Sequence, residues 1–325
     1  MKKFLLIVLL PSFLFAQNIK DGIQRDTSFT LSSTAKKIMQ DYPHASPVIY
    51  KPSDKTILLK NLVYSSINGR NLQIDIFEPS NRNSELLPPV VLIHGGGWRS
   101  GSKELEWNMA QAIAENGFIC ATVEYRLSPE ALYPAAVHDI KTAIRWLKEN
   151  SKKFNLDKNK IAVYGTSAGG QLAALVGTTF GMEKFEGENS NLNYSSDVHA
   201  IIDVDGILDF THPAESNKDS DPLKPSAGKA WFGYSYKEKP ELWMEASPFN
   251  YVTEKTPPIL FINSSQDRFH AGRDYMIEKM NIYNIYSEVH TIPDTPHPFW
   301  LFHPWFKKTL DYTVTFLNRV FKKQK

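Results

Sequence analysis

The chain has 325 residues, enough for one large α/β domain or two ordinary domains. Its 42% hydrophobic and 22% charged residues are typical of a globular protein with a buried core. The 37 basic and 35 acidic residues nearly cancel, which argues against a nucleic-acid partner because such a partner requires a basic face. The single cysteine, Cys120, excludes an intramolecular disulfide.

Residues 1–16 begin with a pair of lysines and continue as an apolar run that ends at Ala16. This order is typical of a secretory signal peptide, and the run is short for a membrane span. Leu14 stands where a cleavage site prefers a small residue, so an uncleaved anchor is the alternative. We therefore expect a periplasmic or secreted protein that has no membrane segment once the signal peptide is removed.

Residues 17–60 are polar and contain many turn-forming residues, and we interpret them as an N-terminal arm before a catalytic domain at 61–325. Two segments with alternating polarity follow, at 60–66 and 71–79, on either side of Asn68-Gly69. The alternation predicts an antiparallel hairpin, for which Asn-Gly is a preferred turn. A sheet with one exposed face places these strands at its edge.

From Pro88 onward, continuous apolar runs alternate with segments of helical periodicity. The runs predict strands buried on both faces, at 89–93, 118–126, 160–165, 199–207, 257–267 and 287–293. Apolar residues every three or four positions predict helices at 105–117, 134–154, 169–180, 271–283 and 306–321. The alternation predicts an α/β fold, with a mostly parallel sheet and helices on both faces.

Two segments interrupt this alternation, at 181–196 and 211–252. The first is polar and rich in Gly and Asn, and the second is rich in Pro, Lys and aromatic residues. We expect both to be cap excursions over the strand ends, where loops form the walls of a ligand site. No internal repeat and no linker divide the chain.

Ser167 lies between Gly165 and Gly169, at the point where a predicted strand becomes a predicted helix. A serine on such a tight turn is lifted out of the sheet, and its neighbours must be small. The N–H of Ala168 and the positive end of the helix then face the reacting centre. The motif predicts a nucleophile, and a glycine-rich turn with an N-capping serine is the alternative.

His94 and three glycines, Gly95 to Gly97, end the predicted strand at 89–93. Without side chains, their N–H groups can approach a developing oxyanion. The alternative is a phosphate-binding loop, which would continue with a lysine and a serine or threonine. Trp98 and Arg99 follow instead, which favours the oxyanion interpretation.

The segments HGGGW, YRLSPEALYPAAVHDIKTAIRWL and GTSAGG resemble the α/β-hydrolase fold. They are similar to its hormone-sensitive-lipase-like carboxylesterases and to secreted esterases of plant-polysaccharide-degrading bacteria. The resemblance covers the chain from about residue 61 and is far more specific for fold than for substrate. It implies an oxyanion hole of Gly96, Gly97 and Ala168. We expect no cofactor and, because no His/Cys/Asp/Glu group has metal-ligand spacing, no metal.

An ester-cleaving serine needs a base, and the base needs an orienting carboxylate. In this fold the acid follows a late strand, and Asp267 stands just past the predicted strand that contains PPILFIN. The family usually has a glycine three positions before this acid, where this chain has Ser264. Asp274 is the rival, but it falls inside a predicted helix. We predict Asp267 as the acid.

The histidine comes from the loop after the last strand in this fold. His297 stands in that loop and is followed by Pro298, so we predict it as the base. His290 falls within the predicted strand, and His303 has no strand just before it. Asp294, three residues before His297, is expected to have a turn role.

Trp98 and Trp300 are predicted to contact substrate, because aromatic rings beside the motifs can stack on sugars; the alternative is that these rings fill the core or support a lid. With export and the resemblance, this favours a small ester or an esterified plant polysaccharide from which acetyl or feruloyl groups are removed. The alternatives are a peptidase like prolyl oligopeptidase, an amide hydrolase, or a non-catalytic binding protein on the same fold. The sequence leaves the oligomeric state open.

Overall fold

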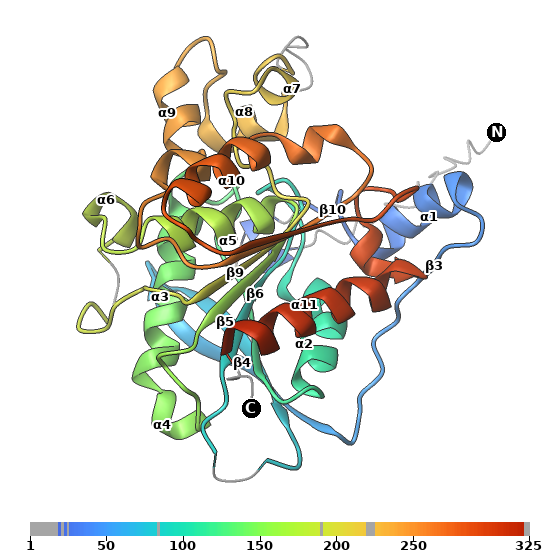
Figure 1. The fold of residues 1–325 in the computed structure, drawn as a ribbon, viewed down its shortest axis with the longest axis vertical. Helices are drawn as coiled ribbons and strands as arrows, with labels where there is room; N and C mark the ends of the chain where they lie inside the picture. The colour runs from blue at the N-terminus through green and yellow to red at the C-terminus, as the bar shows by residue number, and fades with distance from the viewer. Residues whose placement is uncertain are drawn as a thin grey trace, which may run out of the picture.

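The computed structural model describes residues 19–20, 23–24, 26–82, 85–188, 191–218 and 225–321 (Figure 1). An eight-stranded sheet forms its centre, in the order β11-β10-β9-β8-β6-β7-β5-β4. The strands are β4 (Thr56–Ile67), β5 (Arg70–Pro79), β6 (Pro89–Ile93), β7 (Ile119–Val123), β8 (Ala162–Thr166), β9 (Ala200–Val204), β10 (Ile259–Asn263) and β11 (Ser287–Thr291).

Strands β6 to β11 pair in parallel, whereas β5 pairs antiparallel with both β4 and β7. This arrangement confirms the predicted α/β-hydrolase fold with antiparallel strands at the N-terminal edge of the sheet. The hairpin is also confirmed, because Ile67 pairs with Arg70 and leaves a two-residue turn. Asn68 and Gly69 have φ of 51° and 82°, the positive values that this turn type requires.

The central strands bury both faces, which explains their continuous apolar sequences. In β6, Val91 and Ile93 join one hydrophobic cluster, and Val90 and Leu92 join the other. Helices α3 (Ala135–Glu149), α5 (Ala168–Thr178) and α10 (Arg273–Ile282) contribute to the first cluster. Helices α1 (Leu31–Asp41), α2 (Trp107–Ala114) and α11 (Trp305–Phe321) contribute to the second (Figure 1).

The N-terminal arm has more regular structure than its sequence indicates. Thr30 caps α1 by accepting a hydrogen bond from the N–H of Ser33. Strand β3 (Ser46–Pro47) pairs with β12 (Phe302–His303), and β1 (Ile19–Lys20) pairs with β2 (Ile23–Gln24). Leu31, Ala35 and Ile38 recur at helical spacing and pack on the core, so the sequence does carry a helix signal in this part of the arm.

The two cap excursions lie in different places. The first contains α6 (Glu183–Glu186) and packs on α3, where Glu186 pairs with Lys141 and Arg145. It contacts α3 because α5 has by then carried the chain away from Ser167. The second contains α7 (Pro213–Ser216), α8 (Ala227–Phe232) and α9 (Pro240–Glu245), which gather at one end of the sheet (Figure 1). Short helix α4 (Ser151–Phe154) follows α3.

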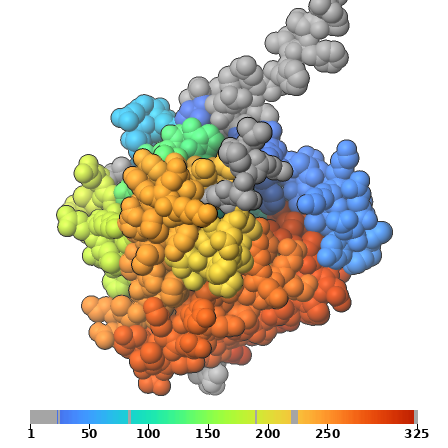
Figure 2. All heavy atoms as spheres, turned by 90° about the horizontal axis from the view of Figure 1, so that it is seen from above, coloured from blue at the N-terminus to red at the C-terminus, as the bar shows by residue number. Residues whose placement is uncertain are grey.

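Figure 2 shows the second excursion, in yellow to orange, packed beside the darker orange segment that follows it in the chain. The predicted signal peptide at 1–16 lies outside the described residues. In the part of the chain that the structure describes, no helix combines the length and apolar character that membrane crossing needs.

Candidate active site

Ser167 occupies a sharp turn between β8 and α5. Its φ of 54° and ψ of −120° are rare for a residue with a side chain. The N–H of Ser167 donates to the carbonyl of Val204 on the neighbouring strand β9, at 2.8 Å. The turn therefore lifts the hydroxyl above the carboxyl ends of the strands while the sheet holds its backbone.

The glycines around Ser167 are required by contacts between backbones. A Cβ on Gly165 would lie 1.9 Å from the carbonyl oxygen of Gly169. A Cβ on Gly169 would lie 2.0 Å from the carbonyl oxygen of Ile93, at the end of β6. The Gly-x-Ser-x-Gly spacing thus allows α5 to begin directly against two strands.

His297 meets Ser167 from the loop after β11. Its Nε2 lies 2.7 Å from Ser167 Oγ, so the structure brings these two predicted residues into hydrogen-bond contact. The ring of Phe269 stacks on the imidazole with centroids 3.5 Å apart, and Trp300 lies edge-on at 5.2 Å. The rival His290 stacks on Tyr312 instead.

Asp205, which follows β9, orients His297. The Nδ1–H of His297 donates to Asp205 Oδ2 at 2.9 Å, and the carboxylate is fully buried. The N–H of Ser264 donates to the other oxygen, Oδ1, at 2.7 Å. Because Nδ1 carries the proton, Nε2 is the acceptor for the Ser167 hydroxyl.

The prediction of Asp267 as the acid is wrong in this structure. Asp267 begins the 3-10 helix η3 (Asp267–His270), and its side chain is fully exposed. Its Oδ1 lies 4.0 Å from His270 Nδ1. The segment after β10 turns Asp267 to solvent because Phe269, two residues later, packs on His297.

A sequence signal for Asp205 exists in the segment HAIIDVDGI. Asp205 directly follows a predicted buried strand, and the carboxyl ends of parallel strands meet at one edge of a sheet. Gly206 follows, and Asp205 itself has a φ of 55°, which aspartate tolerates better than most residues. The family resemblance predicts the acid after the next strand, at Asp267, and the structure places it after this one.

Burial controls the protonation of the site. It lowers the pKa of His297 below its usual value, although the hydrogen bond to Asp205 opposes this effect. Burial also raises the pKa of Asp203, two residues before Asp205, to about 7. His297 is therefore neutral at pH 7, the form that accepts a proton from serine.

The glycine loop lies directly beside Ser167. A Cβ on Gly95 would stand 3.0 Å from the Ser167 Cβ and 2.7 Å from the carbonyl oxygen of Thr166. Gly96 and Gly97 have φ of 122° and 59°, conformations that favour glycine. The three predicted oxyanion donors, Gly96, Gly97 and Ala168, thus belong to two segments that flank the serine.

A buried carboxyl group beneath the serine turn was not predicted. Thr166 Oγ1 donates to Glu106 Oε1 at 2.8 Å, one residue before the nucleophile. Burial raises the pKa of Glu106 to about 8, so its carboxyl group is mostly protonated at neutral pH. Glu106 stands at the start of a predicted helix, where a glutamate gives no sign of burial.

Trp98 and Trp300 lie in the interior, contrary to the prediction that they contact substrate. Trp98 is 4% exposed, stacks on Trp231 at 4.8 Å and donates from Nε1 to Gln171 Oε1. Trp300 is 2% exposed and packs against the ring of His297. Neither ring offers a free face to a sugar, because both complete the core around the site.

The sequence of the chain is similar to those of known proteins. Residues 74–271, more than half of the chain, match the family model described as BD-FAE. The chain is 30% identical over 195 residues to Esterase LipC of Mycobacterium tuberculosis (strain ATCC 25618 / H37Rv). That match covers 60% of this chain and 48% of LipC, so the chain spans about half the length of this curated relative.

Solved structures also superpose on the chain. A truncated carbohydrate esterase from gut microbiota has a TM-score of 0.70 at 24% identity, covering 83% of this chain and 100% of that chain. An acetyl ester-xyloside bifunctional hydrolase from Caldicellulosiruptor lactoaceticus has a TM-score of 0.65 at 23% identity, covering 78% and 89%. At such identities the likeness concerns the fold.

Proposed function

The chain belongs to the BD-FAE family, and from this premise we propose that it hydrolyses carboxylic esters through an acyl-enzyme on Ser167. The main support is the chain of hydrogen bonds from Ser167 through His297 to Asp205, at 2.7 and 2.9 Å. Such a chain makes a serine hydroxyl nucleophilic at neutral pH.

In the proposed mechanism, Ser167 Oγ attacks the ester carbonyl as His297 Nε2 takes the hydroxyl proton. Asp205 holds the imidazole in the required tautomer and stabilises the imidazolium. The N–H groups of Gly96, Gly97 and Ala168 stabilise the oxyanion, and each is expected to contribute about 3 kcal/mol to lowering the barrier.

The tetrahedral intermediate then breaks its bond to the alcohol oxygen, which receives the proton from His297. Water, deprotonated by the same histidine, attacks the acyl-enzyme and releases the carboxylic acid. The free serine regains its proton from the imidazolium, so the cycle ends with the protein in its starting form.

For the substrate we propose an ester on a plant polysaccharide, with acetyl or feruloyl as the acyl group. The names of two structural relatives, a carbohydrate esterase and an acetyl ester-xyloside hydrolase, support this class of substrate. The signal-like sequence at 1–16 supports action in the periplasm or outside the cell, where such polymers occur.

The experiment is hydrolysis of acetyl, feruloyl and methyl esters, with a peptide panel beside them. We expect Ser167→Ala to lower kcat on the preferred ester by about 10⁴-fold or more. Ser235→Ala is the control, because Ser235 is half-buried and its hydroxyl donates to Glu238. Unchanged turnover in Ser167→Ala, or cleavage of peptides and no esters, would refute the proposal.

A further inference from the structure

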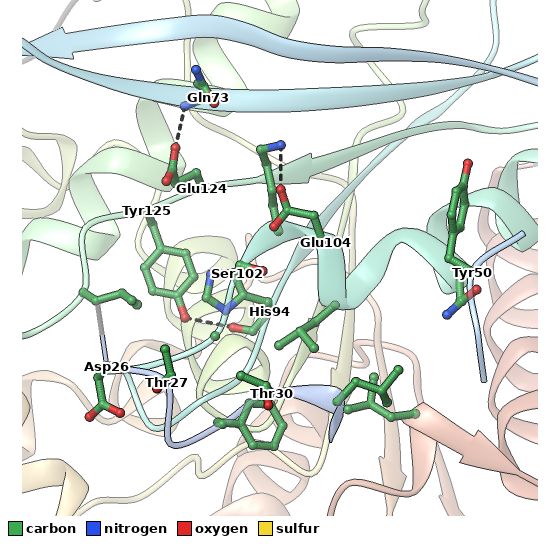
Figure 3. Close-up of a pocket in the computed structure, with 18 of the residues that line it drawn as sticks. Asp26, Thr27, Thr30, Tyr50, Gln73, His94, Ser102, Glu104, Glu124 and Tyr125 are labelled. Atoms are coloured by element: carbon green, nitrogen blue, oxygen red, sulfur yellow. Dashed lines mark hydrogen bonds and ion pairs between the residues drawn. The ribbon is translucent and has the colours of Figure 1, made fainter. Parts of the chain in front are cut away.

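A cavity lies behind the glycine loop. Its volume is about 710 Å³, within the range of about 300–1,000 Å³ that is usual for small-molecule sites. The N-terminal arm at 26–31, the start of α2 and the end of β7 enclose it (Figure 3). Ser167, Asp205 and His297 do not line this cavity, so it is distinct from the catalytic centre.

The charged groups in the cavity wall are paired with opposite charges. Lys103 bonds Asp75 at 2.5 Å and Glu104 at 3.2 Å. Asp26 pairs with Arg99 at 2.6 Å, and Glu124 pairs with Arg70 at 2.9 Å. Because each described charge already has its counter-ion, the cavity is better suited to a neutral ligand than to an ion.

The remaining wall combines polar and apolar surface. Gln73 and Asn108 contribute amides, Thr27 contributes a hydroxyl and Tyr50 contributes an aromatic ring. Figure 3 shows Tyr50 at the side of the cavity away from Thr27 and Tyr125. A sugar ring has the matching chemistry, with hydroxyl groups at its edge and C–H groups on its faces. We propose that this cavity is an accessory site for a neutral saccharide of one or two rings.

The cavity is connected to the catalytic centre through His94 and Tyr125. Tyr125 donates its hydroxyl hydrogen to the carbonyl of His94 at 2.8 Å, and the two rings stack at 4.5 Å. His94 directly precedes Gly95, which lies against the serine turn. A saccharide in the cavity is therefore separated from the oxyanion loop by the packed rings of Tyr125 and His94, which are each 1% exposed. The choice of a saccharide as ligand rests in part on the proposed function.

The test is calorimetric titration of the Ser167→Ala protein with xylobiose, which needs no turnover. We expect saturable binding, and at least tenfold weaker binding, about 1.4 kcal/mol, when Thr27→Trp fills the cavity mouth. Gln73→Leu, which keeps the volume and removes an amide, is expected to weaken binding as well. Lys36→Trp is the matched control, because Lys36 lies exposed on α1 in the same arm and outside the cavity wall.

Absence of xylobiose binding, or equal binding by the three variants, would overturn the proposal. The ester assay on the wild-type chain is read separately. An inactive wild-type chain that binds xylobiose in the cavity would refute the esterase function alone. An active chain whose affinity for xylobiose is unchanged by Thr27→Trp and Gln73→Leu would refute the accessory site alone.

Discussion

At the residue scale, His297 is held from three directions. Asp205 contacts Nδ1, Ser167 contacts Nε2, and the Phe269 ring lies flat against one face at 3.5 Å. These contacts leave the imidazole one orientation, which is the preorganisation that proton transfer requires. The chemistry of the site therefore depends on the partner of Nδ1.

We expect Asp205→Asn to lower kcat by about 10⁴-fold, because an amide does not hold the required tautomer. Asp267→Asn is the matched control, since its exposed carboxyl contacts neither His297 nor Ser167. Steady-state kinetics on an acetyl ester checks both variants. The reverse ranking would restore Asp267 as the acid and contradict the observed geometry.

We expect the acid limb of the pH profile to lie below the usual histidine pKa of about 6.5. Burial lowers the pKa of His297, and only the neutral ring accepts the serine proton. Activity therefore rises with pH through this lowered pKa and is already high at pH 7. The measurement is kcat/KM from pH 4.5 to 9. A midpoint above 6.5 would contradict the predicted direction.

Local motifs predict the residues whose role depends on neighbours in sequence. Ser167 and the glycines belong to this class, because the tight turn itself demands small flanking residues. Asp205 does not, because the choice between two strand ends depends on which one reaches His297. The burial of Trp98 depends on Trp231 and Gln171, which are distant in sequence, so no local pattern reveals it.

At the element scale, the contact between α5 and β6 fixes the serine turn. We expect Gly169→Ala to lower the free energy of unfolding by about 3 kcal/mol, the upper end for overpacking, since its Cβ would meet the Ile93 carbonyl oxygen at 2.0 Å. Activity should fall by about 10²-fold, because Ser167 moves with the helix. Urea unfolding and ester turnover measure both effects.

Gly181→Ala provides the comparison for this substitution. No atom lies within 4 Å of its Cβ position, and its only obstacle is a φ of +72°. We expect a loss of about 1–2 kcal/mol in stability and unchanged turnover. If Gly169→Ala behaved in the same way, the packing explanation for the motif would be wrong.

Elements with strong local patterns were predictable from sequence, and those held by tertiary contacts were not. The β4–β5 hairpin follows from alternation and Asn68-Gly69, both readable within twenty residues. Helix α1 has apolar residues at helical spacing, Leu31, Ala35 and Ile38, so the helix was predictable but its place in the molecule was not. Its position depends on α11 and β12, more than two hundred residues later.

At the scale of the whole molecule, the arm is part of the folded unit. Ile38 is 6% exposed within the cluster that α2 and α11 share, and β3 pairs with β12. We expect Ile38→Ala to reduce the free energy of unfolding by about 2–5 kcal/mol. Met39→Ala, at the neighbouring and 47% exposed position, should change it by less than about 0.5 kcal/mol.

The measurement is chemical denaturation of both variants, and we expect each to unfold in one transition. Equal stability of the two variants, or a separate early transition for the arm, would show that the arm folds independently. A single transition is expected because the arm shares its core with elements from the other end of the chain.

Asp205 directly follows β9 and Ser167 directly follows β8, so the acid and the nucleophile stand at the ends of adjacent strands, linked by the pairing of Thr166 with Val204. The exposed turn at 266–268 therefore supplies no residue to the Ser167–His297–Asp205 hydrogen bonds. Such a turn can change in length or sequence while the hydrogen bonds among Ser167, His297 and Asp205 stay in place. For protein engineers it is a grafting point, from which new recognition loops would overhang the Phe269 side of the imidazole.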